Sequence, residues 1–214
     1  MKNNIQRKIS VVMPSYLGAY DGSASNRILK FNRAINSFLN NKYPFKELII
    51  VSDGCKDTCE IYLEKYSMYP EIKLIKIDKQ PMFSGNVRDE GLKNAKGKII
   101  CYLDTDDTIG EDHLQNLNKN FDTNIYDWVY YNDYIRYFYR DHIEPTEREV
   151  WAKSGLIGTS SIAHINNKSI SWQGCDKYGH DWTFVERLIR LYPRYEKIKE
   201  CSYIVCHIPN SVDH

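Results

Sequence analysis

The strongest chemical signal in the sequence is a cluster of acidic residues, Asp104, Asp106 and Asp107. Three carboxylates this close together repel one another unless a cation neutralises them. Oxygen ligands suit Mg²⁺ or Mn²⁺, and either metal ion can also bind a diphosphate. The alternative is an Asp-rich turn in which Asp107 or Thr108 caps the next helix. Because the cluster directly follows an apolar segment, metal binding is the favoured interpretation.

The same residues allow a second chemistry. An Asp-x-Asp pair after an apolar strand resembles the first motif of haloacid-dehalogenase-type phosphatases, with Asp104 as the nucleophile and Asp106 as the acid/base. Such enzymes need a later apolar strand that ends in paired acidic residues, and a lysine between the two motifs. The later acidic candidate, Asp181, begins a predicted helix instead. The phosphatase motif also usually starts its domain, whereas three predicted strands precede Asp104.

Strands must position these carboxylates, and the first half of the chain alternates between strand and helix patterns. Short apolar, β-branched runs predict buried strands at residues 9–13, 47–51, 72–77 and 98–103. Apolar residues at helical spacing predict helices at residues 28–39, 58–66 and 87–95. Gly97 is expected to close the third helix. This alternation predicts an α/β fold with a mostly parallel central sheet flanked by helices.

Three polar or turn residues, Pro14, Asp53 and Asp104, come at the ends of these predicted strands. Ligands of parallel α/β sheets bind outside the carboxyl ends of the strands. In the second half, the patterns predict helices at residues 113–121 and 182–191, a strand or pair of strands at 128–138 and a last strand at 203–205. No repeat or linker is visible, so a single domain is expected over residues 1–214.

Composition limits the classes of function. The 214 residues are 42% hydrophobic and 27% charged, with a net charge of +1, which is typical of a soluble globular protein without a nucleic-acid partner. No apolar run approaches the ~20 residues that span a bilayer, and residues 1–8 are polar, without the apolar core expected of a signal peptide. The six cysteines lack zinc-knuckle spacing and are expected to be free thiols in the cytoplasm.

Six short segments, taken in order, resemble the family 2 glycosyltransferases of the GT-A (Rossmann-like) fold. They are VVMPSY at 11–16, VSDGCKD at 51–57, GNVRDEGL at 85–92, DTDD at 104–107, YGHDW at 178–182 and YIVCHIPNS at 203–211. The resemblance covers nearly the whole chain. It implies that residues of about 8–110 bind a nucleotide sugar and residues of about 111–214 bind the acceptor.

The resemblance assigns roles at the donor site. Asp53 would accept the imide N–H of a uracil-type base, which fits uridine or thymidine better than cytidine. The base would pack on the loop of Pro14, Ser15 and Tyr16. Further donor contacts are implied for Arg88, Asp104, Thr105 and Asp106. The direct ligand of the Mn²⁺ or Mg²⁺ ion would be Asp106 or Asp107, a choice that stays open, and His207 would be a further metal or diphosphate contact.

At the acceptor site the resemblance makes Asp181 the general base of an inverting transfer. The alternative for Asp181 is a helix N-cap. The acceptor sugar would lie against Trp172, Tyr178, His180 and Trp182, although these aromatic residues could equally belong to the core. His180 replaces the Glu that the family has before the base, and Ser52, Asp89, Val205 and Cys206 also depart from the family pattern.

Together these features predict an inverting, metal-dependent glycosyltransferase that uses a nucleotide-sugar donor, with a uridine diphosphate sugar favoured. The acceptor would be a hydroxyl group of a glycan or glycolipid, assembled at the cytoplasmic side with peripheral membrane contact possible. A second possibility is a sugar-nucleotide-binding module without turnover, which would keep Asp53 and the acidic cluster but lack a working base.

Overall fold

The computed structural model describes residues 5–21, 23, 25–81, 83–136 and 144–206. Its centre is a seven-stranded sheet with the order β10-β6-β9-β4-β1-β2-β3. The four strands of the first half run parallel: β1 (Ile9–Ser15), β2 (Lys46–Asp53), β3 (Ile72–Ile77) and β4 (Ile99–Tyr102). The strand β9 (Ile162–Ile165) runs antiparallel to both of its neighbours, β4 and β6 (Trp128–Tyr130), and β10 (Tyr195–Lys197) is parallel to β6.

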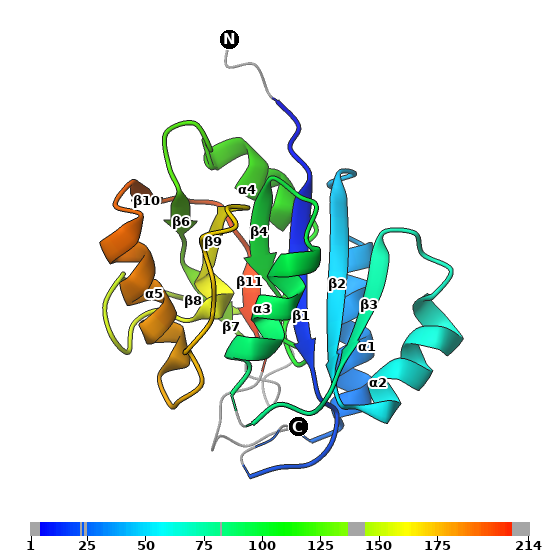
Figure 1. The fold of residues 1–214 in the computed structure, drawn as a ribbon. Helices are drawn as coiled ribbons and strands as arrows, with labels where there is room; N and C mark the ends of the chain where they lie inside the picture. Colours follow the sequence, from blue (N-terminus) through cyan, green and yellow to red (C-terminus); the bar gives the residue numbers. More distant parts are fainter. Residues whose placement is uncertain (1–4, 22, 24, 82, 137–143, 207–214) are drawn as a thin grey trace.

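Helices cover both faces of this sheet (Figure 1). One face packs on α1 (Arg27–Leu39), on α4 (His113–Asn120) and on α2 (Lys56–Ile61), which continues into a π-helical turn, η1 (Tyr62–Tyr66). The other face packs on α3 (Gly85–Asn94) and α5 (His180–Leu191). Within β1, Val11 and Met13 pack in the first core cluster and Val12 in the second. A strand buried on both faces reads as a continuous apolar run, as this one does.

A second, smaller sheet includes residues near the carboxyl end of the described chain. Its order is β5-β11-β7-β8, formed by β5 (Thr108–Ile109), β11 (Tyr203–Val205), β7 (Asp133–Ile135) and β8 (Thr146–Arg148). A short 3₁₀ turn, η3 (Thr159–Ser161), leads into β9. Buried Asp133 accepts hydrogen bonds from Arg148, Ser160 and Ser161, so that β7 fixes the position of this turn.

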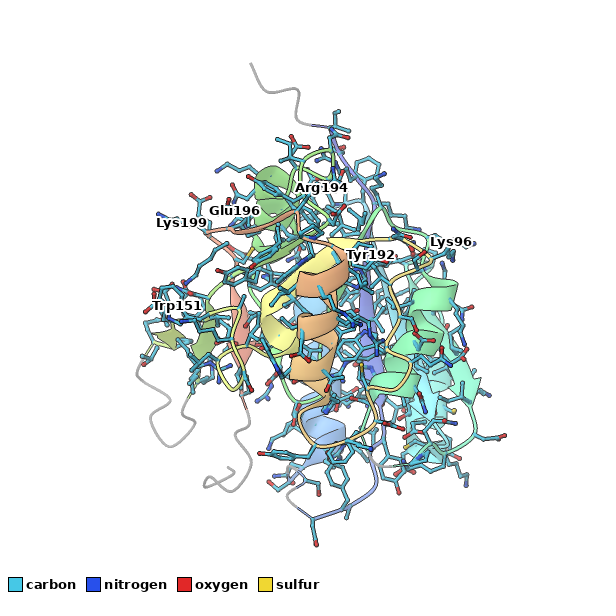
Figure 2. The ribbon with its side chains drawn as sticks, turned by 60° about the vertical axis from the view of Figure 1, so that its left-hand side comes forward. Lys96, Trp151, Tyr192, Arg194, Glu196 and Lys199 are labelled. Atoms are coloured by element: carbon cyan, nitrogen blue, oxygen red, sulfur yellow. The ribbon has the colours of Figure 1, made fainter. Side chains whose placement is uncertain are left out.

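The far end of α5 is attached to the outer strands. Figure 2 shows Tyr192 and Arg194 at this end of the helix. Trp128 Nε1 donates to the carbonyl of Tyr192 (2.9 Å), and Arg194 Nε donates to the carboxylate of Asp127 (3.1 Å). These contacts hold α5 along the sheet, with its first residues at the opposite end.

The predicted mostly parallel α/β architecture is confirmed, and some local predictions are wrong. The helix predicted at about 58–66 is present, although it begins at Lys56 and changes to a π-helix at Tyr62. Gly97 does not close α3, which ends at Asn94; its N–H donates to Ser10 Oγ (2.8 Å) instead. Of the strand or pair of strands predicted at 128–138, the pair is found, with β6 and β7 in different sheets. Thr108 lies in β5 and caps no helix.

Gly91 lets α3 lie directly on the sheet. A Cβ atom at this position would come within 2.3 Å of Val12 Cγ1 on β1. Such a distance is far below a van der Waals contact, so only glycine permits this approach. The close packing brings Arg88, one turn earlier in α3, over the carboxyl edge of the sheet.

A buried carboxylate ties together the amino ends of the strands. The side chain of Glu47 on β2 is 1% exposed, and its oxygens accept from Lys8 Nζ (2.9 Å), Lys73 Nζ (2.6 Å), Ser10 Oγ (2.6 Å) and the Lys96 N–H (2.7 Å). Burial would raise the pKa of Glu47, but the hydrogen bonds, led by that from Lys73, outweigh it and lower the pKa to about 2.

Replacing Glu47 with Gln is expected to lower the free energy of unfolding at pH 7 by about 2–3 kcal/mol. Since the pKa of Glu47 is lowered on folding, its contribution is present above the unfolded pKa of about 4.5 and is lost as the pH falls towards 2. Urea denaturation from pH 7 to pH 3 should therefore show a shallower loss of stability in the variant. The exposed residue Glu64, changed to Gln, is the matched control, and equal pH slopes in wild type and Glu47→Gln would contradict the assignment.

Candidate active site

The carboxyl ends of β1, β2 and β4 lie at one edge of the central sheet (Figure 1), and several predicted site residues stand at these ends. β1 ends at Ser15, β2 ends at Asp53, and Asp104 comes two residues after the end of β4. The amino end of α5 reaches the same edge, which brings His180 and Asp181 to these strand ends. Residues more than 160 positions apart in the sequence therefore form one site.

Arg88 is the centre of this site. One guanidinium nitrogen, Nη2, donates to Asp104 Oδ1 (2.8 Å) and to Thr159 Oγ1 (3.2 Å). The other, Nη1, bonds to Ser84 Oγ and lies 3.3 Å from His180 Nε2. The guanidinium carbon also lies 5.2 Å from the centre of the Trp172 ring, in cation–π contact. Arg88 therefore links α3 with the end of β4, with η3 and with the start of α5.

The burial of Arg88 changes its expected role. Its side chain is only 3% exposed, and both ends of its fork are engaged within the protein. Burial would lower the pKa of Arg88, but the charges of Asp104 and Asp181 raise it, and the group is a permanent cation. The resemblance implied a direct donor contact for Arg88; the structure places its fork behind Asp104, where it orients that carboxylate.

Asp181 lies in the first turn of α5 with 32% of its side chain exposed. The N-cap of the helix is Gly179 in a left-handed conformation (φ 79°), so the alternative role of Asp181 as the cap is wrong. Its Oδ1 lies 3.1 Å from His180 Nε2 and 3.5 Å from Thr159 Oγ1, the donor of a hydrogen bond to it. This carboxylate is oriented by its neighbours and remains accessible.

The electrostatic surroundings keep Asp181 ionised. Burial would raise the pKa of its carboxyl group, but the hydrogen bond with His180 and the positive charge of Arg88 hold the pKa below the ordinary value. His180 Nε2 lies between these two groups. It can donate to Asp181 or accept from Arg88, but a single ring nitrogen cannot do both at once. The histidine that departs from the family pattern thus contacts the predicted base directly.

Two members of the acidic cluster have different surroundings. Asp107 is 5% exposed, and its carboxylate accepts from Tyr203 Oη (2.8 Å) and from the Cys206 N–H (2.8 Å) of the β11 segment. Burial, reinforced by Asp106 and Asp104, raises the pKa of Asp107 well above its ordinary value. Asp106 is only half-buried, and its carbonyl accepts from Arg33 Nη2 (2.6 Å). Of the two candidate metal ligands, Asp107 is thus committed to holding β11.

Metal binding is not visible as a preformed cage. In the part of the chain that the structure describes, no three or more His, Cys, Asp or Glu side chains are grouped to hold a metal ion. Of the predicted metal contacts, His207 lies outside the described residues. Thr105, a predicted donor contact, is largely buried, with 9% exposure. Asp104, with 32% of its side chain exposed, and half-buried Asp106 remain as carboxylates that a ligand can reach.

Asp53 and Tyr16, two residues predicted to bind the base, both contact Lys79. Asp53 is 6% exposed; its Oδ2 accepts from Lys79 Nζ (2.7 Å) and its Oδ1 from the Gln80 N–H (2.6 Å). The Lys79 ammonium also lies 4.5 Å from the centre of the Tyr16 ring. Pro14 lies in β1, two residues before Tyr16.

Ser15, in contrast, points into the interior. It is 1% exposed and its Oγ bonds to Thr58 Oγ1 (2.8 Å), so it presents no surface to a base.

The predicted acceptor residues separate into core and surface. Trp172 has no exposed surface; it stacks on Phe184 (3.8 Å between ring centres) and donates to Tyr102 Oη (2.8 Å). This tryptophan belongs to the core beneath Arg88, so the prediction that it stacks on a sugar is corrected. Trp182 is half-buried against the same core. Tyr178, 94% exposed, is free to contact an acceptor, as is half-buried His180.

The model of glycosyl transferase family 2 matches residues 10–189, a span that contains every contact of Arg88 described above. The chain belongs to glycosyl transferase family 2. The match favours the glycosyltransferase interpretation of Asp104 and Asp106 over the phosphatase alternative.

Curated relatives of this family 2 chain include two bacterial proteins whose names refer to teichoic acid and to poly(ribitol-phosphate). The chain is 32% identical to the minor teichoic acid biosynthesis protein GgaB of Bacillus subtilis over 115 residues, and this aligned segment covers 53% of this chain and 12% of GgaB. It is 33% identical to the poly(ribitol-phosphate) beta-N-acetylglucosaminyltransferase TarP of Staphylococcus aureus over 118 residues, and this segment covers 52% of this chain and 32% of TarP. The matched segment thus covers about half of this chain and a minor part of each relative.

Solved structures share the fold. Residues 1–349 of S. aureus TarS in complex with UDP-GlcNAc superpose with a TM-score of 0.69 at 16% identity, covering 95% of this chain and 60% of that one. The mannosyltransferase PcManGT of Pyrobaculum calidifontis, solved with GDP-Man and Mn²⁺, gives a TM-score of 0.66 at 15% identity and covers 98% of this chain and 59% of that one. These similarities confirm the GT-A fold of the family 2 chain.

Three residues of the site, Lys79, Tyr203 and Thr159, were not predicted from the sequence to take part in it. Lys79 follows the end of β3, so its place at the carboxyl edge could have been found from the strand pattern. Tyr203 lies in a segment that was singled out, but its contact with the acidic cluster depends on the small sheet. Thr159 gave no signal, because the turn that carries it precedes a strand that the apolar pattern did not predict.

Proposed function

We propose that this chain catalyses the inverting transfer of a sugar from a nucleotide sugar, with uridine diphosphate as the favoured carrier, to a hydroxyl group of a glycan or glycolipid. The observation that carries the proposal is the placement of Arg88. Its guanidinium joins Asp104, on the donor side, to His180 and Thr159, which contact Asp181 on the acceptor side. One buried cation thus sets the positions of two carboxylates with different tasks.

Asp181 is the proposed general base. It takes the proton from the acceptor hydroxyl while that oxygen attacks the anomeric carbon, and the bond from this carbon to the diphosphate breaks on the opposite side. This displacement inverts the configuration. A positioned base contributes about 10²–10⁴-fold to the rate. The lowered pKa of Asp181 keeps it in the basic form at neutral pH, and its exposure leaves it open to the acceptor.

Asp53 and Asp104 bind the donor in this proposal. Asp53 lies at the end of β2 and accepts from the base, while Asp104 lies on the sugar-diphosphate side next to Asp106. Arg88 acts as a positioning residue, because its own side chain is buried. The proposal is supported by the family and by the relatives TarP and TarS, whose names and complexes refer to N-acetylglucosaminyl transfer and UDP-GlcNAc.

Asp106 and Asp104 are the residues that would hold a divalent cation. Mg²⁺ and related ions commonly use one or two carboxylates and take their remaining ligands from substrate phosphates and water, so two accessible carboxylates fit such an ion without a larger protein cage. When bound, the ion neutralises negative charge on the departing nucleoside diphosphate. Asp107 is 5% exposed and holds the β11 segment, so the proposal assigns the direct metal contacts to Asp104 and Asp106.

Thermal stability measured against a panel of nucleotides tests the donor site. A ligand at about 100 times its dissociation constant that binds only the native state adds about 2.7 kcal/mol to the free energy of unfolding. We expect a rise in the melting temperature with uridine diphosphate that is larger in the presence of Mn²⁺. The Asp106→Asn variant should lose the Mn²⁺-dependent part and keep a smaller nucleotide effect. If no nucleotide shifts the transition with metal present, the proposed function is wrong.

A further inference from the structure

Gly54 allows the loop after β3 to lie directly against the end of β2, where Asp53 is located. Gly54 has a left-handed conformation (φ +60°), and a Cβ atom there would lie 2.8 Å from both the backbone nitrogen and the Cβ of Lys79. The Gly54 N–H donates to the carbonyl of Ile77 (3.0 Å), and the Gln80 N–H donates to Asp53 Oδ1. The segment that carries Lys79 is therefore pressed against the end of β2 and is not a loose surface loop.

The Lys79 side chain is more exposed than the Asp53 carboxylate that it contacts. It is 46% exposed, whereas the side chain of Asp53 is only 9% exposed. Two of its three N–H donors are used, on Asp53 Oδ2 (2.7 Å) and on the carbonyl of Gln80 (2.8 Å). The ammonium also lies over the Tyr16 ring. Among the described residues, the third N–H of this ammonium has no hydrogen-bond acceptor, and it belongs to a group that lies beside the Asp53 carboxylate and over the Tyr16 ring.

We propose that Lys79 determines base specificity: its ammonium donates to the keto oxygen next to the imide N–H that Asp53 accepts. This inference rests on the proposed function. A donor beside an acceptor complements bases that present a keto oxygen beside an N–H, which are uracil, thymine and guanine. Cytosine and adenine present an amino group beside an unprotonated ring nitrogen, so in the same position they place donor against donor and acceptor against acceptor.

Isothermal titration calorimetry of the purified chain with uridine and cytidine diphosphates, in the presence of Mn²⁺, tests this role. We expect wild type to prefer uridine diphosphate, and Lys79→Met to reduce the preference by about tenfold, which corresponds to about 1.4 kcal/mol. Lys79→Arg, which keeps a cationic donor, should restore part of the preference. In 4-thiouridine diphosphate a weakly accepting sulfur replaces the keto oxygen but the imide N–H remains, so this analogue should lose less affinity than uridine diphosphate on going to Lys79→Met.

Lys76→Met is the matched control, because Lys76 is an exposed lysine of β3 and its loss changes the net charge equally. This variant should keep the wild-type preference. Equal losses for both nucleotides in Lys79→Met, no preference in wild type, or tighter binding of uridine diphosphate by the variant would overturn the inference, while the proposed function would stand. Failure of wild type to bind any of the nucleotides would overturn the proposed function as well.

Discussion

Replacing Asp181 with Asn is expected to reduce the rate of sugar transfer by about 10²–10⁴-fold, the contribution of a positioned general base. The amide has nearly the same shape and can still meet His180 and Thr159, but it cannot take a proton from an acceptor hydroxyl. The described contacts of Asp181 are with His180 and Thr159 and do not include Asp53 or Tyr16, so nucleotide affinity should be unchanged. Transfer is measured as release of nucleoside diphosphate in the presence of an acceptor glycan, and affinity by calorimetry.

Asp176→Asn is the matched control for this variant. Asp176 is exposed and lies in the segment that leads into α5, so the substitution removes the same charge from the same region. It should leave the transfer rate at the wild-type value. The comparison also separates the enzyme from a sugar-nucleotide-binding module, since a module without turnover would be indifferent to Asp181→Asn. Wild-type turnover in Asp181→Asn would show that another group accepts the proton.

The parallel half of the fold could be predicted because its strands have simple surroundings. Val11, Val12 and Met13 are buried on one face or the other, so their strand is a continuous apolar run. Ligand-binding residues then follow from topology, since strand ends of a parallel sheet meet at one edge. For this reason Asp53 and Asp104 were placed on that edge correctly from their positions after strands.

The second half could not be predicted to the same degree, because its order depends on long-range pairing. β9 enters the central sheet between β4 and β6, and the small sheet joins β5 to β11, which follows it by more than 90 residues. Short strands such as β8, all of whose residues are exposed, carry no apolar pattern. The contacts of Thr159 with Arg88 and Asp181 depend on exactly these elements, and no local spacing in the sequence indicates them.

Burial is the other property that residue types alone left open. Trp172 and Arg88 are residue types that often bind ligands, and both lie in motifs or segments at the site. In the structure the guanidinium of Arg88 lies over the indole ring of Trp172 in cation–π contact. Both side chains are buried, so neither is exposed at the surface where the substrate is proposed to bind.

Replacing Arg88 with Met should cost about 3 kcal/mol in the free energy of unfolding and lower kcat/KM by more than about 100-fold. Removal of one partner of a buried ion pair typically costs about 3–5 kcal/mol, and the partial exposure of Asp104 places this pair at the lower end. Without the cation, Asp104 faces Asp106 and Asp107 unpaired. Arg88→Lys keeps the charge but not the fork, so it should fold more stably than Arg88→Met and still transfer sugar slowly.

The pH profile distinguishes positioning by Arg88 from a purely structural role. Because the charge of Arg88 helps to hold the pKa of Asp181 down, its loss in Arg88→Met raises that pKa, and the acidic limb of the activity profile moves to higher pH. Arg187→Met is the control: Arg187 donates only to the carbonyls of Ser171 (2.7 Å) and Gln173 (2.8 Å) among its hydrogen bonds in the described residues. It should lose stability but keep the wild-type acidic limb. An unshifted limb in Arg88→Met, measured where the variant is folded, would show that Arg88 acts on stability alone and that Asp181 is set by His180 and Thr159.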